Sequence, residues 1–426
     1  MEILSRPGIV IVLVLWILPH ILFLRLVTVG FCKNTLIICI VCLATVYAIK
    51  PVTFDLPKYS SYLASGYLGN NQYSYSKEDG LVLHPWDTTG DPFVQAYPAD
   101  RAFAQLARGL HHLLPIGPYL PRVAAGHYRY VSDFQVIAIA ILGLFILMLA
   151  CLVACRAMLA KESIAQTILY CLPIVMGSVF FMIGSQNAVR QFLGMSVILL
   201  ALSLFVKRQY LVALILIVLA TSLHHWSFVF GIFCLVATIG IHFVTTTNKH
   251  SSSISAFLKY MTLGLTIGAC AVVGIKLIIS GSLNYIELFQ YISANTSYFG
   301  ELKQYGLMNT SELLSRSDAE TKLILVGMLF LVSELILGRT RSINDFDIRS
   351  FRVVTYSFLI PLSIYPELMS RILVFYFGFE IFFICWAVMR EERRARLAGW
   401  IVLMGHGFAL NSINVLIGPD WLYSFA

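Results

Sequence analysis

Long apolar runs separated by short polar breaks form the main pattern of this 426-residue chain. A helix that spans a membrane needs about 20 mostly apolar residues, because its backbone groups must be hydrogen-bonded within the segment. The runs near that length predict about twelve spanning helices, at 8–30, 34–49, 132–154, 164–184, 188–206, 210–223, 226–246, 257–280, 321–338, 351–366, 371–389 and 397–417. The first run is longer than the apolar core of a signal peptide, roughly 7–15 residues, so we expect a retained span.

The composition agrees with this pattern, since 58% of the residues are hydrophobic and only 12% are charged. The mean hydropathy is +0.80, a balance that soluble domains of this size do not reach. We therefore expect an all-α fold, a polytopic transmembrane helical bundle that forms one integral membrane domain over residues 1–426. The net charge of +8 does not indicate a nucleic-acid partner, because the basic residues cluster in short loops.

Short basic loops predict how the bundle is oriented, because Lys and Arg favour the cytoplasmic side. The loops rich in these residues are 155–162, 207–209, 338–352 and 389–396. If all four are cytoplasmic, two long polar segments, 50–131 and 281–320, become extracytoplasmic loops. The candidate residues described below then lie near the outer ends of their helices.

The first long loop contains a predicted amphipathic helix at 98–115. Its apolar face and its polar stripe follow helical spacing, with Phe103, Leu106, Leu110 and Leu113 opposite Arg101, Gln105, Arg108 and His112. The helix either lies on the outer membrane face or packs on the bundle, and the sequence leaves both open. Arg101 and Arg108 in the stripe are candidate substrate-binding residues.

Arg190 is the strongest candidate for chemistry, because a charge at helix depth costs about 2.5–3.5 kcal/mol on insertion scales. Gln191 follows it and Asn187 precedes it by three residues, so several polar groups gather at one helix start. A guanidinium there can bind a diphosphate through paired, charge-assisted hydrogen bonds. The alternative is that Arg190 snorkels to the lipid headgroups.

A break between two apolar runs carries His224, His225 and Trp226, with Ser227 following. Histidine titrates close to ambient pH and can take a proton from a hydroxyl. Tryptophan can stack on a sugar ring or lie in an interfacial belt. We expect one functional histidine of the two, the alternative being a turn residue that is hydrogen-bonded to the backbone.

Further candidates lie at other predicted helix ends. Arg371 is either a second anion-binding arginine or the partner of Glu367 in a surface ion pair. Asp55 and Tyr59 follow the second span, where turn chemistry is the simpler interpretation of Asp55.

Ionisable residues also fall inside predicted spans. Glu334 and Glu380 lie deep and need partners, which leaves a proton relay open, whereas Lys276 can snorkel. The nine cysteines all lie in or beside apolar runs without metal-ligand spacing, so we expect small core residues and no metal site. No phosphate-binding glycine loop is present, which argues against ATP coupling within this chain.

The segment 187–233 resembles the signature region of the EpsG/Wzy-type polysaccharide polymerases. The resemblance rests on Arg190 and Gln191 opening an apolar helix, a basic turn at 207–209, and His224 or His225 close to Ser227. Two looser likenesses are Asp55 with Tyr59, and the Ser-Arg-Ile triplet at 370–372. The doubled histidine departs from the family pattern and leaves open which of the two occupies the family position.

The resemblance implies a polymerase of the bacterial inner membrane that joins undecaprenyl-diphosphate-linked oligosaccharide repeat units on the periplasmic face. Arg190 and Arg371 would hold the departing diphosphate, and a histidine would orient or deprotonate the acceptor hydroxyl. No cofactor is expected, membrane lipids are partners, and a chain-length regulator is a further candidate partner. The alternatives are another lipid-carrier-dependent glycosyltransferase, an O-antigen ligase, or a flippase or transporter of lipid-linked oligosaccharides.

Overall fold

The structure is a computed structural model of the whole chain. It describes residues 73–76, 80–83, 100–114, 120–124, 127–131, 134–158, 164–178, 180–181, 189–224, 226–247, 253–279, 316–337, 346–390 and 392–417. The predicted spans at 8–30 and 34–49 lie outside these residues, and so does most of the 50–131 segment.

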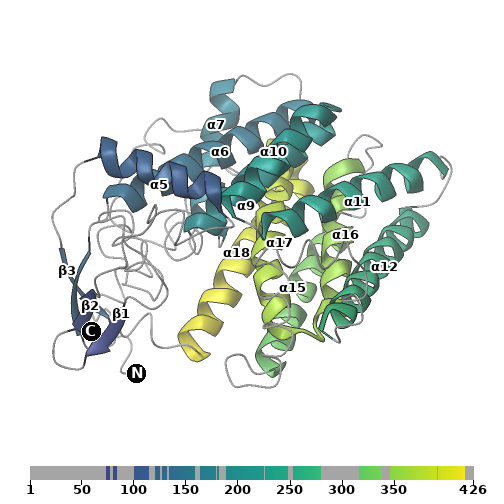
Figure 1. Cartoon of the computed structure of the whole chain (residues 1–426). Helices are drawn as coiled ribbons and strands as arrows, with labels where there is room; N and C mark the ends of the chain where they lie inside the picture. Colours follow the sequence, from purple (N-terminus) through teal and green to yellow (C-terminus); the bar gives the residue numbers. More distant parts are fainter. Residues whose placement is uncertain are drawn as a thin grey trace, which may run out of the picture.

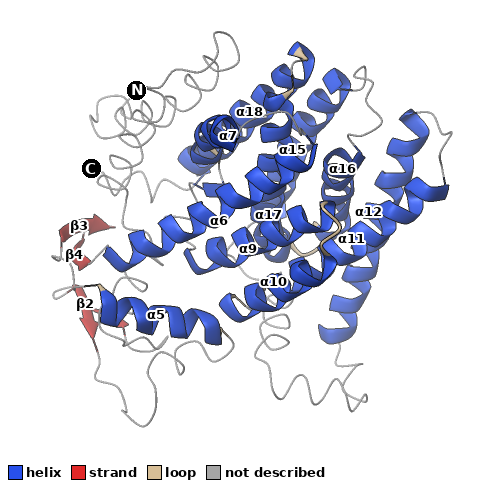
Figure 2. Cartoon of the chain, turned by 90° about the horizontal axis from the view of Figure 1, so that it is seen from above, coloured by secondary structure: helices blue, strands red, loops and turns tan. Residues whose placement is uncertain are grey.

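Helices make up nearly all of the described chain, and two short hairpins lie at one edge (Figure 2). The helices are α5 (Arg101–Leu113), α6 (Phe134–Met158), α7 (Ile164–Gly177), α9 (Val189–Val206), α10 (Tyr210–Leu223), α11 (Ser227–Thr247), α12 (Ser253–Ile279), α15 (Arg316–Leu337), α16 (Phe346–Leu362), α17 (Pro366–Met389) and α18 (Arg393–Ile417). The hairpins pair β1 (Tyr73–Ser76) with β2 (Gly80–Leu83), and β3 (Leu120–Ala124) with β4 (His127–Val131), both antiparallel.

Four described helices are long and apolar enough to span a membrane: Val136–Cys155, Val189–Val206, Ser227–Thr246 and Ile254–Leu277. Shorter apolar stretches occur at Tyr210–Leu223, Leu323–Leu337 and Phe375–Met389. The protein is therefore a helical membrane protein by its architecture, and the total of about twelve spans stays a prediction.

Helix α9 lies inside the bundle, between α6 and α10 (Figure 1). Within its spanning segment 72% of the residues are buried, compared with 17% in α12. Apolar side chains of α10 and α12 instead point outward, among them Leu211, Val218 and Ile254. Such an apolar outer surface is what a lipid environment requires.

Helices α12 and α16 pack closely because glycines line their contact. Gly264 and Gly268 are spaced four residues apart, so they share one face of α12. That face meets the backbone carbonyl oxygens of Val354 and Phe358 in α16. A Cβ at Gly268 would lie 2.7 Å from the Phe358 oxygen, so only glycine lets the two backbones come this near.

The amphipathic helix predicted at 98–115 is present as α5 and packs on the bundle, where it contacts α10 and α6. Phe103, Ala104 and Ala107 are buried in the core, while Arg101 and Gln105 are exposed. Of the two arrangements that the sequence left open, the described residues show α5 packed on the bundle, with Leu106 and Leu110 of the predicted apolar face partly buried and Leu113 exposed.

Some predicted boundaries were wrong. The basic segment 338–352 is not wholly a loop, because α16 begins at Phe346 and carries Arg349 and Arg352 within the helix. The segment 281–320 likewise ends in helix, since α15 begins at Arg316. The hairpins within 50–131 were not predicted, because their strands are only four or five residues long.

Four of the cysteines gather where three helices meet. Cys151 and Cys155 of α6, Cys171 of α7 and Cys385 of α17 are buried free thiols. No group of three or more His, Cys, Asp or Glu side chains within the described ranges is placed to hold a metal ion.

Candidate functional site

The start of α9 meets the break between α10 and α11. A Cβ built on Gly194 would lie 2.6 Å from the Ser227 Oγ and 3.1 Å from the His224 Cβ. Arg190 precedes Gly194 by four residues and therefore lies on the same face of α9, one turn away. The structure thus brings Arg190 and His224, separate in the sequence, to one end of the bundle.

Helix α17 lies alongside these segments and runs in the same direction as α9 and α11. The rings of Phe230 in α11 and Phe375 in α17 stack with centroids 4.1 Å apart, and Leu199 of α9 lies against Gly378. Position 371 lies on the face of α17 that Phe375 and Gly378 define, about one turn closer to the helix start. The α17 backbone therefore places position 371 level with the starts of α9 and α11; the Arg371 side chain lies outside the described residues.

Arg190 is held by an aspartate that the sequence analysis did not single out. Its Nη1 donates a hydrogen bond to the Asp100 Oδ2, and the two form an ion pair. The Asp100 side chain is 1% exposed and that of Arg190 is 17% exposed. Arg190 is therefore turned toward a carboxylate of the protein. It does not adopt the alternative arrangement, in which it snorkels to lipid headgroups.

Asp100 immediately precedes α5 at the N-cap position, yet its side chain makes no capping hydrogen bond to that helix. Aspartate is a preferred N-cap because its carboxylate normally accepts from the first free N–H groups of the helix. Here the carboxylate faces Arg190 instead. The ion pair thus connects the start of α5 to the start of α9.

His224 and Ser227 are both buried at the break between α10 and α11. The His224 backbone is extended there, its N–H donates to the Ala220 oxygen at 2.9 Å, and its own oxygen accepts from the Ser227 N–H at 2.8 Å. The Ser227 Oγ has no hydrogen-bond partner among the described residues. A buried hydroxyl in this state normally carries a desolvation cost.

The remaining candidate residues are placed as follows. Trp226 is buried in the core, and Gln191 is partly buried in the first turn of α9. Arg108 donates through Nη1 to the Gln105 Oε1 at 3.3 Å on the outer side of α5. The others, Asn187, His225, Asp55 and Tyr59, lie outside the described residues.

A second charged cluster lies deeper, between α15, α16 and α17. Arg352 donates through Nε to both carboxylate oxygens of Glu380 at 2.7 and 2.9 Å, and through Nη1 to Glu334 at 2.7 Å. Its Nη2 donates to the Ser333 Oγ at 2.5 Å. Arg349 also donates to Glu334, at 2.7 Å.

Two aromatic rings enclose the guanidinium of Arg352, which lies 4.5 Å from the Phe330 centroid and 4.2 Å from the Phe383 centroid. Two arginines and two glutamates make the cluster formally neutral. Glu334 and Glu380 thus have the partners that their depth required. Such a closed set of contacts indicates a structural role.

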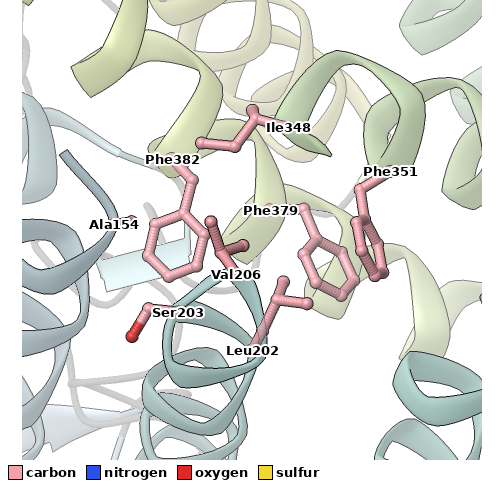
Figure 3. Close-up of a pocket in the computed structure, with 8 residues that line it drawn as sticks. All are labelled: Ala154, Leu202, Ser203, Val206, Ile348, Phe351, Phe379 and Phe382. Carbon is pink, nitrogen blue, oxygen red and sulfur yellow. The ribbon is translucent and has the colours of Figure 1, made fainter. Parts of the chain in front are cut away.

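A cavity near the opposite end of α9 is too small for a sugar (Figure 3). Its volume is about 10 Å³, which is at the lower limit for one water molecule. The lining is mostly apolar, with Leu202 and Val206 of α9 facing Phe351, Phe379 and Phe382. This cavity is therefore not a substrate site.

The predictions from the sequence did not include Asp100 or the partners of Glu334 and Glu380. Asp100 looked like ordinary helix-start chemistry, and its link to Arg190 joins positions 90 residues apart. Arg352 fell in both the predicted basic loop 338–352 and the predicted span 351–366, so it was not recognised as a partner of the deep carboxylates. The signal that could have found it was the need for two deep carboxylates to have a cation.

The arrangement at the start of α9 can bind an anion. The N-termini of α9 and α11 meet there, and each carries partial positive charge from its unsatisfied N–H groups. Arg190 adds a full charge, and His224 with Ser227 adds groups that can orient a hydroxyl. No family model, curated protein or solved structure matches the chain.

Proposed function

We propose that this protein is a polysaccharide polymerase of the EpsG/Wzy type, which joins undecaprenyl-diphosphate-linked oligosaccharide repeat units. The growing glycan is transferred from its lipid diphosphate to a hydroxyl of the next lipid-linked unit. The product is O-antigen, capsule or exopolysaccharide. The proposal places the protein in the bacterial inner membrane with its site on the periplasmic side, as the basic loops predict.

The observation that supports the proposal is the packing of Gly194, one helical turn from Arg190, against His224 and Ser227. These residues belong to the segment 187–233 that resembles the polymerases. Position 371 adds a second arginine at the same level of the bundle, because α17 runs beside α9 and α11.

In this mechanism the bond from the donor sugar to the diphosphate breaks while the acceptor oxygen bonds to the same sugar carbon. Arg190 and Arg371 stabilise the charge that develops on the departing diphosphate, since fixed donors in a water-poor site are most effective there. His224 or His225 orients the acceptor hydroxyl and takes its proton. The diphosphate leaves as an anion, so the step requires no proton donor.

Deleting the gene in its native host and separating the surface glycan on a gel tests this function. A polymerase predicts that the ladder shrinks to single repeat units. A glycan of unchanged length would contradict the proposal. Complete loss of the glycan would also contradict it and would favour a flippase or a ligase.

A further inference from the structure

The ion pair between Arg190 and Asp100 raises a question about substrate binding. A diphosphate would engage the terminal nitrogens of a guanidinium, and Nη1 of Arg190 already donates to Asp100. Asp100 is almost fully enclosed, with 1% of its side chain exposed. Substrate phosphate and Asp100 would therefore share one guanidinium, and Asp100 already engages one of its two terminal nitrogens.

The protein gives up a helix cap to make this contact. Aspartate is a preferred N-cap residue, but the Asp100 carboxylate makes no cap bond to α5. Arg190, as the second residue of α9, lies where the helix dipole disfavours a cation. An anion is needed beside the positive charge of Arg190 and the partial positive charge of the α9 start. The Asp100 carboxylate lies where it can balance both.

A diphosphate competes well for this position. It carries more negative charge than one carboxylate and can accept two parallel hydrogen bonds from one guanidinium. It also gains from the N–H groups at the helix start. A single free carboxylate or other monoanion lacks these advantages. It therefore displaces Asp100 from Arg190 less readily than a diphosphate does.

We infer that Asp100 is an internal competing anion, which occupies Arg190 in the unliganded protein and yields it to the diphosphate of the substrate. The inference rests on the proposed function for the identity of that substrate. It makes Asp100 a positioning and selectivity residue that acts through Arg190. Because Asp100 directly precedes α5, the exchange also releases the start of this helix from α9.

Binding of two probes to the purified full-length protein tests the inference: inorganic pyrophosphate and undecaprenyl diphosphate. Asp100→Asn removes the competing charge, so we expect both probes to bind about tenfold more tightly, within the usual range of coupling between sites. Asp100→Glu keeps the charge and should bind as the wild type does. Tighter binding of the lipid probe alone would assign the exchange to lipid-linked ligands.

Glu392→Gln is the matched control, because it removes one carboxylate from an exposed pair with Arg390. It should leave both dissociation constants unchanged. A purely structural role for Asp100 would weaken binding in Asp100→Asn, in proportion to its loss of thermal stability. Equal or weaker binding by Asp100→Asn than by the wild type overturns the inference. If the asparagine variant folds poorly, Asp100→Ser is the second variant, because it also removes the charge and serine is a preferred N-cap residue; equal or weaker binding by it overturns the inference as well.

The two proposals fail separately. If Asp100→Asn tightens pyrophosphate binding but gene deletion leaves the glycan unchanged, the anion exchange stands and the polymerase function falls. If deletion collapses the ladder but neither probe binds the wild type, the function stands and the exchange at Asp100 falls.

Discussion

Two arginines of the bundle differ in how their charge is balanced. Arg352 is enclosed between two rings and donates to two glutamates and a serine. Arg190 lies at a helix start, keeps 17% of its side chain exposed and pairs with a carboxylate from another segment. Both are costly inside a membrane protein, but only Arg190 lies beside a histidine and a buried hydroxyl without a described partner.

This difference in charge balance indicates different roles for the two arginines. A buried arginine whose carboxylates come from the helices packed around it holds those helices in register. An arginine at the meeting point of helix N-termini, paired with a residue that gives up a cap, is placed to exchange its partner. We therefore propose a structural role for the Arg352 cluster and a role in the proposed reaction for Arg190.

The largest effect is expected where the structural cluster is broken. Arg352→Met leaves Glu380 buried without its cation, which typically costs about 3–5 kcal/mol. We expect the free energy of unfolding to fall by that amount, measured by chemical denaturation in detergent. The double variant Arg352→Met with Glu380→Met should recover much of the loss; equal stability of the single variant and the wild type would remove the structural role.

A smaller effect is expected where α9 meets the α10–α11 break. Gly194→Ala places a methyl group 2.6 Å from the Ser227 Oγ, and such overpacking costs about 1–3 kcal/mol. Because the displaced residues include His224, we expect polymer formation to fall further than stability does, measured as ladder length at equal protein amount.

Gly274→Ala provides the control for that change, since nothing lies within 4 Å of a Cβ there. Within α12, whose last residue is Ile279, alanine should stabilise the helix by up to roughly 0.5–1 kcal/mol. An identical ladder from Gly194→Ala and Gly274→Ala would show that the contact with His224 has no role in the reaction.

The smallest effect on stability is expected at Ser227. Its Oγ has no hydrogen-bond partner among the described residues, so Ser227→Ala should change the free energy of unfolding by less than about 1 kcal/mol. Ser196→Ala is the matched control, because the Ser196 Oγ is buried and donates to the Phe192 oxygen at 2.8 Å. A larger loss of stability at Ser227 than at Ser196 would mean that the Ser227 hydroxyl has a structural partner.

The apolar pattern predicted most helices of the described chain to within a few residues. The predicted run 188–206 is the helix Val189–Val206, and 210–223 is Tyr210–Leu223. Such runs are reliable because lipid and a buried core impose the same demand on every residue of a helix. The predicted helix starts were less accurate where charged residues lie, as with Arg349, which belongs to α16 but fell in the predicted basic loop 338–352.

The site was predictable only in part. Arg190 and His224 stand out because polar groups are rare at helix depth. Asp100 does not, because an aspartate before an amphipathic helix is ordinary cap chemistry. Its pairing with Arg190 depends on how α5 packs on α10 and α6, and that packing is a tertiary property.

Turnover per folded molecule tests the central assignment most directly. The purified wild type, Arg190→Ala and the Arg352→Met, Glu380→Met double variant are given undecaprenyl-diphosphate-linked repeat units, and chain growth is followed on a gel. We predict a fall of about 10²–10³-fold for Arg190→Ala, as when one fixed donor to a developing anion is removed, and a near wild-type rate for the folded double variant. Undiminished chain growth by Arg190→Ala would contradict the account.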